Sequence, residues 1–555
     1  MAAGHGVTLR RLLRRLAAPA LLLSCAALAA AAVDADKDDD RPLDARLYAQ
    51  GMDAARAGRR DDAGRLLRRV FTEFPDSPWA PPAILKTVEL VYPVTGWSQI
   101  GSASAPSVQQ AADLLKVLAQ KYRASREAPQ ALVRLGYVGF EPAGARLNLD
   151  EACGRFATAA QIYPDSAAAD DALFASGMCD LLRGRPARAS EMFSRMLEEH
   201  PESPLAGEAQ YRQGVALSLL DDAGEAMLAL QRVRTRAPDS RFATQALDRL
   251  TLLHRMRLQP AIAAAAGREG APLPTEPPSS EGTPLFRPDP EYGAEPRAAA
   301  GAAAGGAAAQ AIRGISDLSI DAQGLIVAAS PKTPAVFRLD ARGRIQERID
   351  HPGPDHVAAA EGLAVFISGR EQIAVNQRNW SGTDLRDADG HTPSDFGPIA
   401  VDTLGTVHLL DRRENAVLVY DRARRLVGAV RPPAGRDGRF VDIAAGVEGS
   451  VYALDARARS AVVLAQGRET KRIDLTPLGA ADPTALAVDG LGDLFVLDGA
   501  TGFVFVGDPQ GKRIAIVRPS RLVTDRTGAI TAIEVDAQGR LYLAGRRSGA
   551  VVRLR

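Results

Sequence analysis

The sequence predicts a multidomain protein in which an all-α helical-repeat solenoid precedes an all-β six-bladed propeller, with a disordered linker joining them. Three observations support this prediction. A Pro-x-Ser motif recurs at a 37-residue step in the first half, an Asp-x-x-Gly turn recurs at steps of 38 to 47 residues in the second half, and a Pro-, Ala- and Gly-rich stretch separates them. Self-similarity at such periods is the sequence signature of repeat architectures.

Length and composition are consistent with this organisation. The 555 residues leave room for at least two domains, and the hydrophobic content of 46% fits folded cores. Because 68 Lys+Arg are balanced by 67 Asp+Glu, the chain lacks the cationic excess of a nucleic-acid-binding protein. Three cysteines are too few for a disulfide scaffold.

Residues 1–35 predict an export signal. A basic segment precedes the apolar run Leu16 to Leu28, and Val33-Asp34-Ala35 is a suitable small-x-small cleavage site. An uncleaved anchor is the alternative, because the apolar stretch from Leu16 to Val33 has 18 residues, close to the ~20 that span a bilayer. No later stretch has the hydrophobicity of a membrane span. We therefore expect an exported protein, periplasmic or associated with the outer membrane.

A lipoprotein signal is a further alternative within the same segment. Leu22-Leu23-Ser24-Cys25 resembles a bacterial lipobox, in which the cysteine is lipidated and becomes the first mature residue. The apolar residues that follow Cys25 favour an ordinary cleaved signal instead. Both possibilities stay open, with Cys25 as the candidate lipidation site.

The helical half is predicted from a repeated motif of proline, an acidic residue and serine. Pro164, Pro201 and Pro238 are spaced 37 residues apart, and Pro75 begins another copy. Proline ends one helix because it lacks an N–H and clashes with the preceding turn. The Asp or Ser after it is expected to cap the next helix. The pattern predicts about five helix pairs over residues 43–256.

Small and large residues recur in step with the motif. Gly177 and Phe193 in one copy correspond to Gly214 and Leu230 in the next. The pattern resembles the tetratricopeptide-type repeats of bacterial envelope proteins of the Tol-Pal and outer-membrane-assembly kinds, with their Tyr-Pro-Asp-Ser-Pro signature. Stacked helix pairs of this kind form an extended concave surface that binds a protein or peptide.

Cys153 and Cys179 are candidates for a disulfide. The predicted helices on either side of Pro164 form an antiparallel hairpin, with Cys153 11 residues before this proline and Cys179 15 residues after it. The two side chains would then lie level. Export permits a disulfide chemically. The alternative is two buried small hydrophobic residues, a common fate of free cysteine.

Residues 259–310 are predicted to be a flexible linker. Pro, Ala, Gly and Glu dominate there, and such a segment buries too little apolar surface to offset the entropy of ordering. A linker of this length would let both halves engage partners at once.

Residues 311–555 are predicted to form the propeller. Short alternating strands are separated by turns, and the clearest turns are Asp321 to Gly324, Asp402 to Gly405, Asp489 to Gly492 and Asp536 to Gly539. Six such units fit a six-bladed β-propeller. The aspartates recur once per blade, so we interpret them as turn formers, with glycine supplying the positive φ.

The blades resemble NHL-type repeats, and residues 401–421 match best, with Asn415 at the family's asparagine position. The chain ends on a third strand of blade six. An open edge is a liability, so the ring should be closed by an upstream strand. Gly282 to Phe286 and Gln310 to Arg313 are the candidates.

No catalytic, cofactor-binding or metal-ligating set is predicted. The seven histidines lie outside HExxH and CxxC contexts, and no nucleophile elbow or Walker loop is present. His351, His356 and His391 are expected to be solvated loop residues.

The leading hypothesis is an exported, non-enzymatic scaffold or adaptor in the bacterial cell envelope. It would bind other envelope proteins or peptides through the helical groove and the propeller face, without nucleic acid or cofactor. It would meet the membrane only through an N-terminal lipid or an uncleaved anchor. The alternative is a propeller that acts as a small-ligand or glycan receptor, with a lip formed by Asn376, Asn379 and Trp380, or as a metal-dependent lactonase- or lyase-like enzyme.

Overall fold

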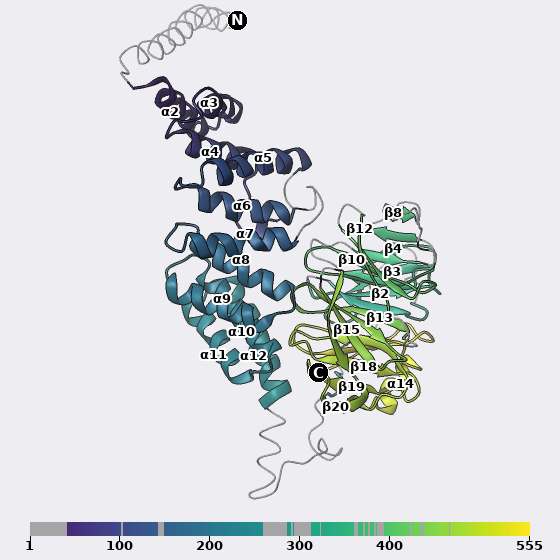
Figure 1. Cartoon of the computed structure of the whole chain (residues 1–555). Coiled ribbons are helices and arrows are strands. Elements are labelled where there is room, and N and C mark those ends of the chain that lie inside the picture. Colours follow the sequence, from purple (N-terminus) through teal and green to yellow (C-terminus); the bar gives the residue numbers. More distant parts are fainter. Residues whose placement is uncertain are drawn as a thin grey trace, which may run out of the picture. The chain divides into compact units, whose positions relative to one another are not determined.

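The computed structural model describes residues 41–100, 104–141, 149–258, 286–289, 292 and, with short gaps, 312–555. It confirms the predicted fold class, a helical-repeat region followed by a six-bladed β-propeller (Figure 1). Two compact units divide the chain at residues 146 and 147, so the last helices belong to the same unit as the propeller. The predicted export signal, Cys25 and most of the predicted linker lie outside the described residues. Within the described ranges, none of the helices is both long and apolar enough to cross a membrane.

The helices follow one another in antiparallel pairs. The first unit contains α2 (Leu43–Arg56), α3 (Arg60–Glu73), α4 (Ala80–Val91), the short η1 (Trp97–Gln99), α5 (Ala105–Lys121) and α6 (Ala128–Gly139). The second unit begins with α7 (Leu149–Ile162), α8 (Ala169–Leu182), α9 (Pro186–Glu199), α10 (Ala206–Leu219), α11 (Ala223–Arg236), α12 (Arg241–Leu253) and the π-helical turn η2 (His254–Leu258).

Glycine allows the two helices of a pair to pack closely. A Cβ added to Gly177 in α8 would lie 2.6 Å from the Phe193 ring in α9, and one on Gly214 in α10 would lie 2.6 Å from Leu230 in α11. Both large side chains are fully buried. The small and large residues that recur in the sequence are therefore the two sides of one helix–helix contact.

The serine of the repeated motif does not cap a helix as predicted. Helices α4, α8 and α10 begin five residues after the proline and have no side-chain cap. The Ser203 hydroxyl instead accepts the N–H of Leu205 at 3.1 Å and donates to Asp170 at 2.6 Å. The physical reason is that a short turn separates the proline from the helix. The serine stabilises this turn and ties it to the preceding repeat.

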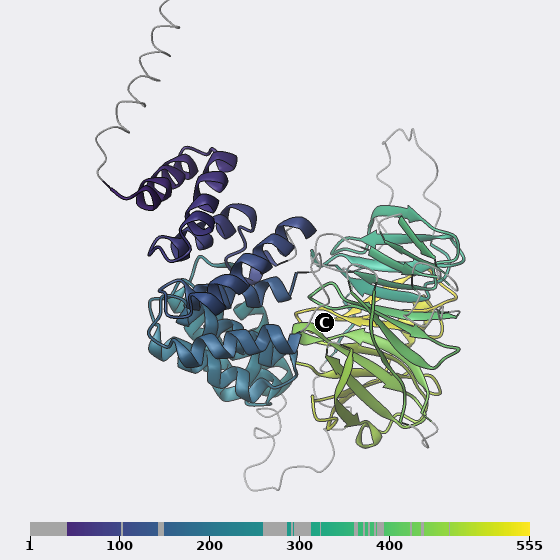
Figure 2. The ribbon, with the colours of Figure 1, turned by 45° about the horizontal axis from the view of Figure 1, so that its top comes forward.

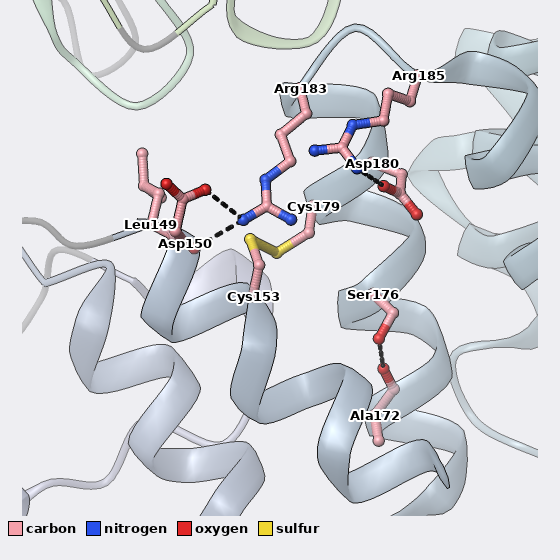
Figure 3. The surroundings of a disulfide bond; sticks show 9 residues. All are labelled: Leu149, Asp150, Cys153, Ala172, Ser176, Cys179, Asp180, Arg183 and Arg185. Carbon is pink, nitrogen blue, oxygen red and sulfur yellow. Dashed lines mark hydrogen bonds and ion pairs between the residues drawn. A yellow bond between two sulfur atoms is a disulfide. The ribbon is translucent and has the colours of Figure 1, made fainter.

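Helices α7 and α8 are joined by a disulfide between Cys153 and Cys179, whose Cα atoms lie 5.8 Å apart (Figure 3). Arg183, at the end of α8, donates to Asp150 in α7 at 2.8 Å. The disulfide and this ion pair lie at the same end of the hairpin, which places α7 in a fixed position against α8.

The propeller consists of five four-stranded antiparallel sheets and one three-stranded sheet. Blade one contains β1 (Asp317–Ile320), β2 (Ile326–Ser330), β3 (Ala335–Leu339) and β4 (Ile345–Asp350), and blade two contains β5 (His356–Ala359), β6 (Val365–Ser368), β7 (Gln372–Val375) and β8 (Arg378–Ser381). Blade three contains β9 (Phe396–Val401), β10 (Val407–Asp411), β11 (Ala416–Tyr420) and β12 (Leu426–Val430), and blade four contains β13 (Phe440–Ala445), β14 (Ser450–Asp455), β15 (Ser460–Ala465) and β16 (Arg468–Asp474). Blade five contains β17 (Pro483–Val488), β18 (Leu494–Asp498), β19 (Val504–Gly507) and β20 (Arg513–Val517), and blade six contains β21 (Ala532–Val535), β22 (Leu541–Ala544) and β23 (Val551–Leu554). The short helices η5 (Val447–Gly449), η6 (Thr476–Leu478) and α14 (Arg521–Thr527) lie in the loops.

The ring is closed at two levels. The inner strands β1, β5, β9, β13, β17 and β21 contact one another in a complete circle. At the outer edge, Pro288 pairs with Leu554 of β23, and the N–H groups of Arg287 and Asp289 donate to Arg555 and Arg553. The upstream closing segment therefore lies at 287–289, directly after the first sequence candidate. Burying this edge removes a row of unpaired backbone groups.

Candidate interaction surfaces

The aspartate of each Asp-x-x-Gly turn stabilises the turn. Oδ1 of Asp321 accepts the N–H groups of Gln323 and Leu325, both at 2.9 Å. Asp402, Asp489 and Asp536 make the same pair of bonds in their own turns. The turn glycines have φ between +71° and +82°, a region that favours glycine: Gly324, Gly405, Gly492 and Gly539. These aspartates are turn-forming residues.

The turns of blades four, five and six form a contact surface for the helices, which we call the turn face (residues 447–449, 489–493 and 536–540). A leucine at the end of a helix lies against the glycine of each turn. A Cβ added to the glycine would lie 2.7 Å from the leucine side chain in the pair Gly449–Leu182, 3.2 Å in Gly492–Leu219 and 2.5 Å in Gly539–Leu252. The first helices of three successive repeats, α8, α10 and α12, thus dock on three successive blades.

Arg212 in α10 forms the polar contact with blade four. Its Nη1 donates to both carboxylate oxygens of Glu448 at 2.6 and 2.7 Å, and its Nη2 donates to Glu208 at 3.1 Å. Burial alone would lower the pKa of Arg212, but the two carboxylates raise this pKa above its usual range. The guanidinium therefore stays charged in the interface, where a paired charge is far less costly than an isolated one.

Arg257 in η2 forms the corresponding contact with blade five. It makes two hydrogen bonds to the fully buried carboxylate of Asp493, at 2.9 and 2.6 Å, and one to Asp221 at 2.7 Å. Burial raises the pKa of Asp493 to about 6 although Arg257 opposes the shift. Burial and the neighbouring Asp493 raise the pKa of Asp489 well above its ordinary value. Arg257 therefore bridges the buried Asp493 of the propeller and Asp221 of the helical array.

Apolar side chains complete the docking interface. One buried cluster contains Val215 of α10 and Leu252 of α12 together with Phe495 and Leu543 of the propeller. Phe286, which precedes the closing segment, belongs to the same cluster. Its ring meets Phe495 edge-on at 5.8 Å, and the Arg255 guanidinium lies 4.6 Å from its centroid. Docking of the helices and closure of the ring therefore share side chains.

The sequence predicted a linker between the two halves, and the structure adds an interface between the last helices and the propeller that the sequence did not predict. Helices α8, α10, α12 and η2 all contact the turn face within one unit. Figures 1 and 2 show the ribbon of this unit from two directions. Sequence reasoning missed the interface because its arginines resemble ordinary solvated surface charges. A signal was present in the turn glycines, which recur on one face of the propeller.

The central channel of the propeller is the second candidate surface. It has a volume of about 330 Å³, and all six inner strands line it. Asp317, Asp442 and Glu534 place carboxyl groups along it. Oδ2 of Asp317 accepts the N–H of Val357 at 3.1 Å, and Oδ2 of Asp442 accepts that of Leu486 at 2.8 Å. Each of these two bonds joins one inner strand to the next, so both aspartates support the ring.

Burial changes the acidity of the channel carboxyl groups. It raises the pKa of Asp442 to about 8, with a further contribution from Asp317. It raises the pKa of Glu534 to about 8 as well, and Asp317 and Asp442 again contribute. Sequence reasoning missed these residues. Glu534 could have been noticed because it interrupts an apolar strand, between Ile533 and Val535.

The structure corrects the expectation that the histidines of blade two lie in solvated loops. His351 and His356 are 7% and 8% exposed, and burial lowers the pKa of His351. His356 begins the inner strand β5, with Nδ1 at 3.2 Å from Asp317 Oδ2 and Nε2 at 2.6 Å from Arg412 Nη2. His391 lies outside the described residues.

The expected loop position of two residues of the proposed polar lip is also corrected. Asn379 and Trp380 belong to the outer strand β8, which pairs with β7, rather than to a loop. Asn376 lies outside the described residues. Among the residues that the structure describes, no group of three or more His, Cys, Asp or Glu side chains is placed to hold a metal ion.

Comparison with known proteins supports the architecture. The family model described as Tetratricopeptide repeat matches residues 171–203 and 208–240. The chain therefore combines tetratricopeptide repeats in its helical half with a six-bladed β-propeller. No curated protein matches the chain.

Similar solved structures share little sequence identity with this chain. A streptogramin B lyase structure has 12% identity and a TM-score of 0.34, covering 45% of this chain and 95% of its own. Virginiamycin B lyase from Staphylococcus aureus has 10% identity and a TM-score of 0.33, covering 44% and 96%. The WD40 propeller domain of Doa1 has 10% identity and a TM-score of 0.32, covering 44% and 93%. Likenesses this weak carry no conclusion about activity.

Proposed function

We propose that the protein is an exported, non-enzymatic scaffold that binds other proteins or peptides of the bacterial cell envelope. The observation that carries this proposal is the docking interface. Its glycine–leucine pairs and two arginine–carboxylate clamps hold a folded protein surface against the repeat helices. A helical array that recognises its own propeller has the chemistry for recognising other protein surfaces.

Two features support a scaffold over an enzyme. Asp317 and Asp442 in the channel accept backbone N–H groups from neighbouring blades, which gives them a structural role. The repeated aspartates hold turns. We infer that catalysis is not the function of this propeller.

Export is supported by the disulfide between Cys153 and Cys179, since disulfides persist in oxidising compartments. We propose a periplasmic or outer-membrane-associated location, with Cys25 as the lipid attachment site if the signal is a lipoprotein signal. Palmitate labelling and N-terminal sequencing of the mature protein test both. An unprocessed, unlabelled chain in the cytosol would contradict export.

Site-specific photo-cross-linking in cells tests the scaffold function. A photoreactive residue is placed at the exposed positions Arg60, Arg68 or Arg413, and at the buried position Val496 as a matched control. We expect discrete adducts with other envelope proteins from the exposed positions and none from Val496. An absence of adducts from every exposed position would contradict the proposal.

The alternative function, reception of a small ligand, rests on the channel with its carboxyl, hydroxyl and guanidinium groups. A thermal-shift screen with sugars and divalent cations tests it. A ligand that stabilises the native chain but not the Asp442→Asn variant would favour this function over the scaffold. No shift with any ligand would remove it.

A further inference from the structure

A groove lies within the first unit, whereas the docking interface belongs to the second unit. Helices α2, α3, α4 and α5 line it, and its volume is about 1110 Å³. Small-molecule pockets usually have volumes of about 300–1,000 Å³, so this groove has the size for a stretch of peptide. None of its lining residues belongs to the propeller.

Arginines dominate the charge of the groove. The residues that line the groove include five arginines and three aspartates: Arg59, Arg60, Arg65, Arg68, Arg69, Asp53, Asp61 and Asp62. Asp62 pairs with both Arg59 and Arg65, and Arg69 pairs with Glu73. Within the described part of the chain, Arg60 and Arg68 form no ion pair and both are exposed. Their guanidinium groups suit the two oxygens of a carboxylate.

The groove also offers apolar surface. Leu66, Leu90 and Val91 are partly exposed along it, and the buried Ala54 also lines it. The three aspartates would repel a uniform polyanion such as a nucleic acid, whereas separate carboxylates can meet separate arginines. Apolar contacts add the part of the affinity that salt does not screen.

We propose that this groove binds an acidic peptide segment of a partner protein, in which glutamates or aspartates alternate with leucine-like residues. The proposal rests on the scaffold function and names the partner chemistry for one of its surfaces. Binding would combine carboxylate contacts to Arg60 and Arg68 with burial of the apolar side chains over Leu66 and Leu90.

Gly64 provides a sharp test of this site. It lines the groove in the middle of α3, and nothing lies within 4 Å of the position that its Cβ would occupy. Gly64→Ala should therefore keep the groove open, and should slightly stabilise the helix. Gly64→Trp should fill the groove without disturbing the core. Comparing Gly64→Trp with Gly64→Ala therefore distinguishes a blocked groove from a misfolded protein.

The experiment measures the anisotropy of a fluorescent Glu/Leu peptide on the full chain, with a Lys/Leu peptide as its counterpart. We expect the Glu/Leu peptide to bind and the Lys/Leu peptide not to bind. Affinity for the Glu/Leu peptide should fall about tenfold or more in Gly64→Trp and in Arg60→Glu/Arg68→Glu. It should be unchanged in Gly64→Ala and in Arg232→Glu/Arg234→Glu, which changes two exposed arginines of α11.

Three outcomes would overturn the proposal. They are equal binding of both peptides, unchanged affinity in Gly64→Trp, and displacement of the peptide by a single-stranded oligonucleotide as effectively as by unlabelled peptide. Cross-linking adducts from Arg413 together with any of these outcomes would retain the scaffold function and remove only this groove. Loss of all cross-linking adducts together with intact peptide binding would remove the scaffold function and retain the groove as a peptide site.

Discussion

At the residue scale, the turn glycines of blades four to six meet two requirements at once. Each has a positive φ, and each leaves space for a leucine of the helical array. Blade one has the same Asp-Ala-Gln-Gly turn as blade six, but nothing lies within 4 Å of a Cβ added to Gly324. Two identical turn sequences thus differ only in whether a helix docks on them.

This difference predicts unequal effects of alanine. Gly324→Ala and Gly539→Ala both force alanine into a positive φ, which costs about 1–2 kcal/mol of folding free energy. Gly539→Ala must also displace Leu252, which adds about 1–3 kcal/mol. Denaturant unfolding of the full chain measures both free energies. Equal destabilisation by the two substitutions would show that Leu252 does not dock there.

The channel carboxyl groups predict a pH dependence of propeller stability. The folded-state pKa of Asp442 is about 8, above its ordinary value of 3.8, so the folded state binds this proton more tightly. The stability that protonated Asp442 contributes to the folded propeller is therefore complete below about pH 4 and is lost as the pH rises through about 8. Asp442→Asn should remain able to accept the Leu486 N–H while removing the charge.

We therefore expect Asp442→Asn to raise the free energy of unfolding by on the order of 1–3 kcal/mol near pH 9, and to flatten its decline between pH 5 and 9. Asp350→Asn, at an exposed strand end, is the control and should leave the decline unchanged. Denaturant melts across this range measure the effect. A parallel decline in the Asp442→Asn variant and the native chain would contradict the assignment.

At the scale of elements, the disulfide fixes α7 against α8, whose last residue, Leu182, docks on blade four. Cys153→Ala/Cys179→Ala is expected to lower the free energy of unfolding by about 2–4 kcal/mol, because the unfolded chain is then less constrained. Thermal unfolding measures the loss. Two free thiols in a non-reducing mass map of the native protein would refute the bond itself.

The closing segment is the second element whose removal has a predictable cost. Asp289 accepts from Arg553 at 3.0 and 2.6 Å, and both side chains are buried. Asp289→Ala should destabilise blade six by about 3–5 kcal/mol, because it leaves a buried guanidinium unpaired. Asp289→Leu/Arg553→Met should recover part of this loss. Faster amide exchange in β23 reports the effect, and unchanged exchange would mean that the ring closes without this segment.

At the scale of the whole molecule, local patterns were predictable and distant contacts were not. The 37-residue period encodes contacts such as Gly177 with Phe193, which lie close in sequence, and the Asp-x-x-Gly turn encodes its own hydrogen bonds. The contact of Leu252 with Gly539 joins the helical repeat to the propeller repeat, and the two repeats have unrelated periods. Neither period contains information about the other, so composition and spacing could not reveal the interface.

The channel was missed for a related reason. Asp317 and Asp442 are each the single acidic residue of a short strand, and only the closed ring brings them to the same channel. His356 was placed in solvent because proline and glycine precede it, whereas it begins an inner strand. Sequence reasoning therefore recovers elements and repeats, but the surfaces on which function depends arise from how the repeats meet.

The central claim is that the last repeats and the propeller form one docked unit that is held by arginine clamps. Hydrogen–deuterium exchange on Arg212→Glu, Glu448→Arg and the double charge-swap variant tests it most directly. Each single variant should speed exchange in α10 and in the blade-four turn, because a buried charge loses its partner. The double variant should restore slow exchange in part, because the 212–448 ion pair re-forms while Glu208 lies beside a second carboxylate. Unchanged exchange in the singles, or no recovery in the double, would contradict the account.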